Sequence, residues 1–167
     1  MTGFRFLTRA WVVLLTAAAI GSAGAVVAPA AASAQAPPWG ACGRSTADDK
    51  VVRTFAVNHR LTYTLRCGNE AGGYRHILIR HKGDYERLAA GTFQNWRDIA
   101  DLSMETIARD PDVALPARNG KACLSRVMFF HNLRTNQLVR QQIFRMIVVV
   151  ATGDIVTLTP HSEHCER

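Results

Sequence analysis

Four cysteines constrain the fold of this chain more than any other feature. Cys42, Cys67, Cys123 and Cys165 all follow an N-terminal segment with the pattern of a secretory leader. An even number of cysteines in an exported chain predicts two disulfide bonds, and three pairings are compatible with the sequence. We favour Cys42–Cys67 and Cys123–Cys165, because each pair brackets a distinct block of the chain. The sequence contains no C-x-x-C pair, so the spacing argues against a zinc site.

The predicted leader covers residues 1–36. It has a basic start, followed by an uncharged apolar run from Trp11 to Ile20. Small residues then lead to Ala34-Gln35-Ala36, which has the A-x-A form of a cleavage site. A membrane span needs about 20 predominantly apolar residues, so the run is short for a retained anchor. We therefore expect cleavage and a secreted, extracellular product without a stable membrane span.

Residues 37–167 are the length of a single domain, which we expect to be monomeric. The whole chain carries a formal net charge of +7, and the part after the leader remains basic. A basic domain suits RNA or another polyanion as a partner, because phosphates dominate such binding. The same charge fits anionic cell-wall polymers or membranes equally well.

The first half of the domain predicts a hairpin followed by two helices. Residues 53–57 and 61–65 are rich in β-branched and aromatic side chains, which indicates a hairpin. Tyr74 to Leu88 has the apolar periodicity of a helix, with Gly83 as its weak point. A second helix is predicted from Thr92, as N-cap, to Asp110-Pro111. Two acidic residues flank its apolar face and are predicted to be solvated: Asp98 and Asp101.

The second half predicts strands. A loop is expected over residues 111–121, and strands over 127–130, 139–151 and 155–159, with Pro160 ending the last strand. Short turns between consecutive strands favour an antiparallel meander. The expected fold class is therefore α+β: an N-terminal hairpin and two helices, followed by an antiparallel β-meander and held by two disulfides.

His81 is the most informative candidate for chemistry. It lies in the apolar stripe of the first predicted helix, between Ile77, Leu78, Tyr85 and Leu88. One interpretation is a core histidine satisfied by a hydrogen bond. The other is a general base at the edge of a helix–sheet cleft, because imidazole titrates near neutral pH.

Other candidates lie on the predicted strands and beside His81. Arg140 and Arg145 are five residues apart, so only one of them can face a cleft. His131 is a candidate acid at the end of the first strand. His76 is expected to point to solvent, about 140° around a regular helix from His81, although a bent helix N-terminus would bring it into the cleft. The remaining candidates are hydroxyls that share one face of the last strand and cations that flank His81: Thr157, Thr159, Lys82 and Arg80.

Two resemblances add expectations to this pattern. The segments around Gly73–His81, Asn95–Asp101 and Gly153–Pro160, with Cys123 and Cys165, resemble a family of small exported actinobacterial proteins of unassigned activity. The order of helices and sheet also resembles the barnase–EndoU–colicin–RelE superfamily of toxin ribonucleases. Its bacterial toxin members carry an early helical histidine and a closing Thr-x-aromatic-Pro strand. Here Thr159 stands where the aromatic residue would be.

The second resemblance implies a secreted endoribonuclease of toxin type that needs no metal or other cofactor, with an immunity protein as a potential partner. His81 or His76 would take the proton from a ribose 2′-hydroxyl, and His131 or the other helical histidine would protonate the leaving oxygen. Arg140 or Arg145, together with Thr157, would stabilise the charge developing on phosphorus. Lys82, Arg80 and Thr159 would contact the RNA. The alternative is a non-catalytic secreted binding or inhibitor module.

Overall fold

The computed structural model describes residues 39–57, 61–90, 92–132 and 134–166. These residues belong to one compact unit, which extends from Ala34 to Arg167. The predicted leader and its cleavage site lie outside the described residues. Within the described ranges, no helix is long and apolar enough to cross a membrane.

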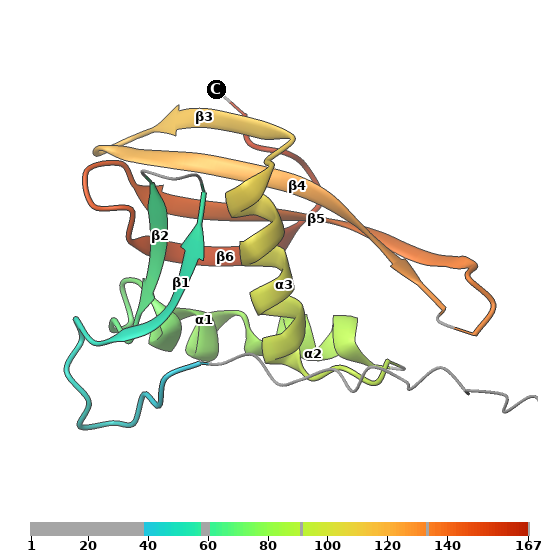
Figure 1. Ribbon diagram of the computed structural model, residues 1–167, viewed down its shortest axis with the longest axis horizontal. Helices are drawn as coiled ribbons and strands as arrows, with labels where there is room; N and C mark the ends of the chain where they lie inside the picture. The colour runs from blue at the N-terminus through green and yellow to red at the C-terminus, as the bar shows by residue number, and fades with distance from the viewer. Residues whose placement is uncertain (1–38, 58–60, 91, 133, 167) are drawn as a thin grey trace, which may run out of the picture. The chain divides into compact units, whose positions relative to one another are not determined.

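The chain forms an α+β domain with antiparallel sheets, as the sequence predicts (Figure 1). In chain order the elements are β1 (Val51–Ala56), β2 (Thr62–Arg66), α1 (Tyr74–Arg80), α2 (Lys82–Ala89), α3 (Trp96–Arg109), β3 (Val113–Ala117), β4 (Lys121–His131), β5 (Leu138–Val149) and β6 (Ile155–His161). Strands β1 and β2 form a separate hairpin, and the other four pair in the order β3-β4-β5-β6.

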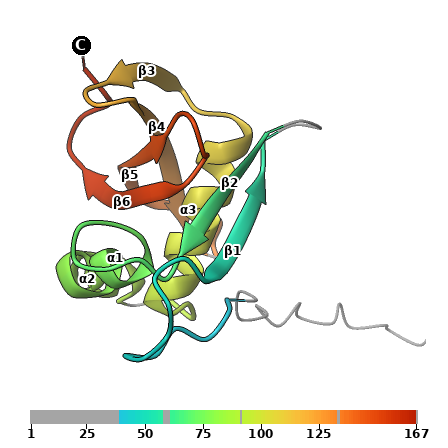
Figure 2. The same cartoon turned by 90° about the vertical axis from the view of Figure 1, so that its left-hand side faces the viewer.

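The four-stranded sheet has one side covered by helices, here called the helix-facing side. Helix α3 runs across this side, while α1 and α2 lie along β6 (Figures 1 and 2). The ring of Tyr85 on α2 stacks on that of Phe144 on β5, with centroids 6.0 Å apart. Because side chains alternate along a strand, Phe144, Met146 and Leu158 share the helix-facing side, and all three are fully buried.

The hairpin β1–β2 is confirmed, and it packs beside α3 (Figure 2). It meets the larger sheet where the amide of Thr64 donates a 2.9 Å hydrogen bond to the carbonyl of Gly153. Gly153 has a φ of 73° and a Cβ there would come within 2.5 Å of the Thr62 carbonyl oxygen. The approach of the two sheets therefore requires glycine in the β5–β6 turn.

Two predictions about prolines in the sheet are wrong. Residues 113–117, expected in a loop, form strand β3, which includes Pro116. Strand β6 does not stop at Pro160 but continues through it to His161. Both prolines lie on the outer strands of the sheet, where one backbone edge has no ladder partner to lose.

The helix boundaries also differ from those expected. The break in the first helical segment is at His81, which separates α1 from α2 with φ −124° and ψ −7°. Helix α3 begins at Trp96 with Asn95 as its N-cap, and a capping box with Asp98 satisfies its first amides. Thr92 precedes this cap, and Phe93 is 96% exposed outside the helix. The helix ends at Asp110, as predicted.

The prediction that Asp101 is solvated is also wrong. This carboxylate is buried and accepts a 3.0 Å hydrogen bond from the Arg53 guanidinium on β1. It also accepts a hydrogen bond from the Trp39 indole. The carboxylate thereby joins α3 to the β1–β2 hairpin and to Trp39.

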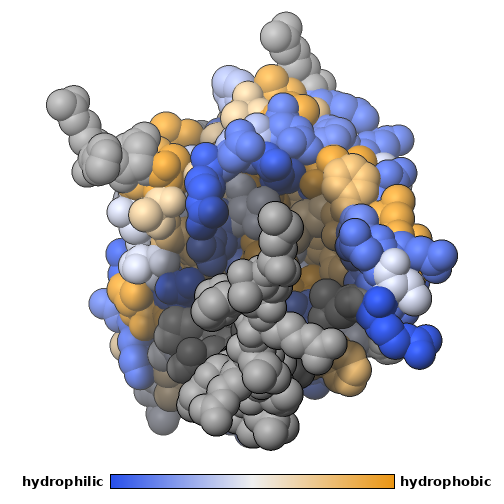
Figure 3. All heavy atoms as spheres, turned by 45° about the vertical axis from the view of Figure 1, so that its right-hand side comes forward, coloured by the Kyte–Doolittle hydropathy of each residue, from blue (hydrophilic) through white to orange (hydrophobic). Residues whose placement is uncertain are grey.

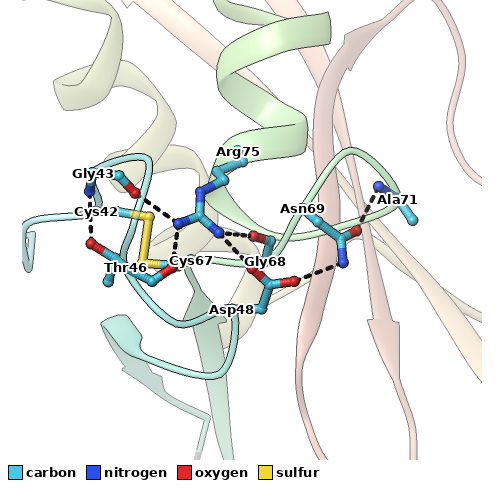
Figure 4. Close-up of polar contacts among 9 residues, drawn as sticks. All are labelled: Cys42, Gly43, Thr46, Asp48, Cys67, Gly68, Asn69, Ala71 and Arg75. Carbon is cyan, nitrogen blue, oxygen red and sulfur yellow. Dashed lines mark hydrogen bonds and ion pairs between the residues drawn. A yellow bond between two sulfur atoms is a disulfide. The ribbon is translucent and has the colours of Figure 1, made fainter.

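Both favoured disulfides are present: Cys42–Cys67 and Cys123–Cys165. Beside the first, Arg75 of α1 is surrounded by acceptors (Figure 4). Its guanidinium donates to the Asp48 carboxylate at 2.6 Å and to the backbone carbonyls of Gly43, Thr46 and Gly68. Arg75 therefore fixes the loop before β1, a structural role that the sequence analysis did not identify.

Candidate functional site

His81 stands at the junction of two helices. Its backbone amide closes α1 by donating to the carbonyl of Ile77, and its carbonyl accepts from the amides of Asp84 and Tyr85 at the start of α2. Gly83 lies two residues later and weakens helix propagation near this point. The junction therefore holds the imidazole at a fixed place on the molecule.

The imidazole of His81 is partly buried. Its side chain is 23% exposed, and Nδ1 lies 3.4 Å from a carboxylate oxygen of Asp84. The expectation that His81 and His76 lie on different faces is wrong, since their ring centroids are 5.3 Å apart. The turn at residue 81 departs from regular helical geometry, which removes the basis for the expected 140° separation. The ring of His76 also contacts the carbonyl of Glu70, at 2.7 Å from Nδ1.

The surroundings of His81 favour the neutral imidazole. Desolvation by burial lowers the pKa of His81, and the hydrogen bond to Asp84 and the charge of that carboxylate oppose this shift. The charges of His76 and Arg80 lower the pKa further. With the Nδ1 proton directed at Asp84, Nε2 carries the lone pair, which is the form a base requires.

A polar cleft lies between α2 and the adjoining ends of β5 and β6. Its volume is about 700 Å³, and its lining residues are Asp84, Arg87, Leu88, Ala90, Arg140, Gln142, Pro160, His161 and Ser162. Arg140 and Gln142 alternate with Gln141 and therefore lie on the helix-facing side, in line with Phe144. Asp84 links the cleft to the His81 junction.

Two arginines line this cleft, and only one of them is ion-paired. Arg87 is ion-paired with Asp84, and its side chain is 74% exposed. The guanidinium of Arg140, by contrast, forms no ion pair or hydrogen bond with any part of the chain that the structure describes, and the residue is exposed. The cleft therefore offers one guanidinium whose donors are free to meet an anion.

The other predicted strand residues lie on the opposite side of the sheet. Arg145 pairs with Thr159, and Ile147 pairs with Thr157, in alternation with the buried Phe144 and Met146. These side chains therefore point away from α1 and α2. The structure does not bring His81 together with Arg145 or Thr157.

Arg145 is instead occupied by the C-terminal segment. Its guanidinium donates to the backbone carbonyls of Glu163 and His164 and lies 3.3 Å from Nε2 of His161. Nearby, Ser125 lies 3.0 Å from Nδ1 of His164, and its hydroxyl oxygen accepts from the amide of Cys165. These contacts hold the segment that ends in the Cys123–Cys165 disulfide.

The remaining predicted residues do not line the cleft. His131 lies near the end of the β4–β5 hairpin, with Nδ1 3.1 Å from the carbonyl oxygen of Asn136. Lys82 is ion-paired with Glu86, and Arg80 is exposed at the end of α1. The hydroxyl of Thr159 donates to the Pro160 carbonyl. Thr157 has a buried hydroxyl oxygen without a hydrogen-bond partner.

Sequence reasoning missed most of the cleft. Asp84 follows His81 by three residues, which is a helical spacing for contact, and this signal was available. His161 and Ser162 were not found, because Pro160 was expected to end the strand before them. No group of histidine, cysteine and acidic residues in the described ranges is arranged to hold a metal ion.

Comparison with known proteins adds no assignment. No family model, curated protein or solved structure matches this chain. The functional argument therefore depends on the cleft and on the side chains around it.

Proposed function

We propose that this protein is a non-catalytic binding domain that takes phosphate groups of a polyanion in the α2–β5–β6 cleft. The observation that carries the proposal is Arg140, an exposed guanidinium in the cleft without a partner in the described chain. Gln142 and Ser162 add neutral donors beside it. The net charge of +7 favours approach of a polyanion over the whole surface.

The arrangement of the candidate residues supports binding over catalysis. Phosphoryl chemistry requires a base and a cation that converge on one phosphate. Arg145 donates to the C-terminal backbone on the side of the sheet away from His81. Arg140 shares the cleft with Asp84, whose carboxylate is already paired with Arg87.

The test uses the full chain and a fluorescein-labelled single-stranded RNA, with affinity measured by fluorescence anisotropy at several salt concentrations. Arg140→Ala should weaken RNA binding about tenfold at low salt, because one phosphate contact is lost. For the same reason, the slope of log affinity against log salt concentration should decrease in magnitude by about one. Inorganic polyphosphate should compete with the RNA if phosphate alone is recognised.

Arg109→Ala is the matched control, since it removes the same charge from an exposed position on α3 outside the cleft. It should change affinity by less than about twofold, in keeping with screening of a distant exposed charge. Equal losses in the two variants would mean that overall charge, and not the cleft, binds the RNA.

A second candidate function keeps the same ligand and adds RNA cleavage. It is favoured by the neutral His81 imidazole, which contacts Asp84 at the edge of the cleft. The labelled RNA from the binding assay should be examined on a denaturing gel after incubation with a chelator. Intact RNA supports the binding domain, whereas cleavage that His81→Ala abolishes would establish the ribonuclease in its place.

A further inference from the structure

The β4–β5 hairpin extends beyond the rest of the sheet as a two-stranded arm (Figure 1). We define the arm as residues 128–132 and 134–141. Strand β3 pairs with β4 only as far as Ser125, and β6 pairs with β5 only from Ile143 onward. The carboxylate of Asp112 accepts from the amide of Val127, which closes the last part of the β4 edge before the arm begins.

The arm exposes large apolar side chains in a domain that buries most others. Phe129 is 56% exposed, Leu138 is 54% exposed and Val139 is 68% exposed. Phe129 points away from the helices, because its neighbour Phe130 packs toward Phe144 with ring centroids 6.5 Å apart. In Figure 3 the right-hand side of Figure 1, toward which the arm extends, is turned forward. Orange hydrophobic atoms are exposed there between blue hydrophilic ones.

The charge around the arm has one sign. The sequence contains no acidic residue from position 113 to position 153, while Arg134 lies beside the tip and Arg140 at the base. Neither arginine is neutralised by a carboxylate within the described chain. Phe129 and Val139 lie on one side of the arm, and Leu138 and Arg140 lie on the other. An arm with apolar side chains on both sides and cations at its tip and base matches a bilayer with anionic headgroups, where apolar side chains enter the interface and arginines meet phosphate.

A second copy of the chain fits this surface less well. Two arms packed against each other would bring unpaired arginines together without any acidic residue from either arm, and like charges in contact oppose association. We propose that the arm docks the protein on anionic phospholipid bilayers. Arg140 belongs to both the arm and the cleft, but the apolar side chains that carry this proposal, Phe129, Leu138 and Val139, do not line the cleft.

The first test measures co-sedimentation of the full chain with vesicles of phosphatidylcholine alone or with phosphatidylglycerol added. The double variant Phe129→Ser/Leu138→Ser should lose binding to the anionic vesicles at least tenfold. Val150→Ser is the matched control, because this apolar side chain is 64% exposed just after β5, at the other end of the strand from the arm. The N-terminal apolar run is common to all variants, so differences between them report on the arm.

A second measurement locates the contact directly. Leu138→Trp should gain fluorescence quenching by brominated lipid in anionic vesicles, and Val150→Trp should show no such gain. Equal vesicle binding by the arm variant and the control, or equal quenching at the two positions, would overturn the proposal. A concentration-dependent dimer that the double variant abolishes, without vesicle binding, would assign the arm to self-association instead.

The two proposals fail separately. The double variant should retain the RNA affinity of the parent chain, because the substituted side chains lie outside the cleft. Because these substitutions change no charge, loss of RNA binding together with vesicle binding would show a folding defect in the double variant. The quenching of Leu138→Trp relative to Val150→Trp would then decide the proposal.

Discussion

The indole Nε1 of Trp39 donates a 2.6 Å hydrogen bond to the carboxylate of Asp101, which lies 62 residues later in the chain. The same carboxylate receives the guanidinium of Arg53, so one acidic side chain joins three separate segments. Only 11% of the Asp101 side chain is exposed, which weakens solvent screening of the ion pair.

We predict that Asp101→Asn lowers the free energy of unfolding by about 2 kcal/mol, because the charge-assisted bonds are lost while the shape is kept. Urea denaturation provides the measurement. Glu105→Gln is the control, since this carboxylate lies 3.8 Å from Arg53 and its side chain is 42% exposed. That change should cost less than about 0.5 kcal/mol, and a similar cost for both variants would contradict the assigned role of Asp101.

The N-cap of α3 gives a second prediction. Asn95→Ala should destabilise the domain by about 1 kcal/mol, because the Asn95 side chain accepts from the amides of Arg97 and Asp98. Thr92→Ala should change stability by less than about 0.5 kcal/mol, since Thr92 precedes the helix and lies on the surface. Thermal or urea unfolding provides the measurement. A larger loss of stability for Thr92→Ala than for Asn95→Ala would favour Thr92 as the N-cap of this helix, as the sequence predicts.

His81 gives a prediction about pH. Burial lowers the pKa of His81 in the folded state, so the unfolded chain binds this proton more readily. The contribution of the neutral His81 imidazole to the free energy of unfolding is therefore complete above the unfolded pKa of about 6.5. It is lost as the pH falls below this value. Stability of the parent chain should decrease more steeply than that of His81→Asn on acidification below this value. An NMR titration midpoint for His81 above 6.5 would contradict the assignment.

The disulfides give a fourth prediction. The Cys123–Cys165 bond closes a loop with a sequence separation of 42, for which chain entropy predicts a contribution of about 4 kcal/mol. Replacing both cysteines with serine should lower the free energy of unfolding by about this amount in urea. The pair Cys42–Cys67, with a separation of 25, should cost slightly less on replacement. A loss below about 1 kcal/mol for either pair would show that the bond does not constrain the unfolded chain.

The fold class, the hairpin and the disulfide pairing could be predicted because each depends on signals within a block of sequence. Strand β3 was missed because Pro116 resembles loop sequence, although Pro116 is compatible with an edge strand. The turn after it contained a usable signal, since Asn119 and Gly120 both have positive φ, the requirement of a tight hairpin turn.

The candidate site was less accessible to sequence reasoning. Periodicity places Asp101 beside an apolar stripe but says nothing about Arg53 or Trp39, which approach it from distant parts of the chain. In the same way, alternation shows that Arg140 and Arg145 lie on opposite sides of a strand. It does not show which side the helices cover, and that decides which arginine enters the cleft.

The prolines in β3 and β6 have a consequence for how these molecules behave when crowded. Each proline removes one backbone amide hydrogen from an edge strand of the sheet. A strand from another molecule would therefore lack one hydrogen-bond donor when it pairs with that edge. Growth of a fibril by strand addition is therefore disfavoured along β3 and along β6. Such protection would keep the folded domain from aggregating at concentrations where an unbroken strand edge would seed aggregates.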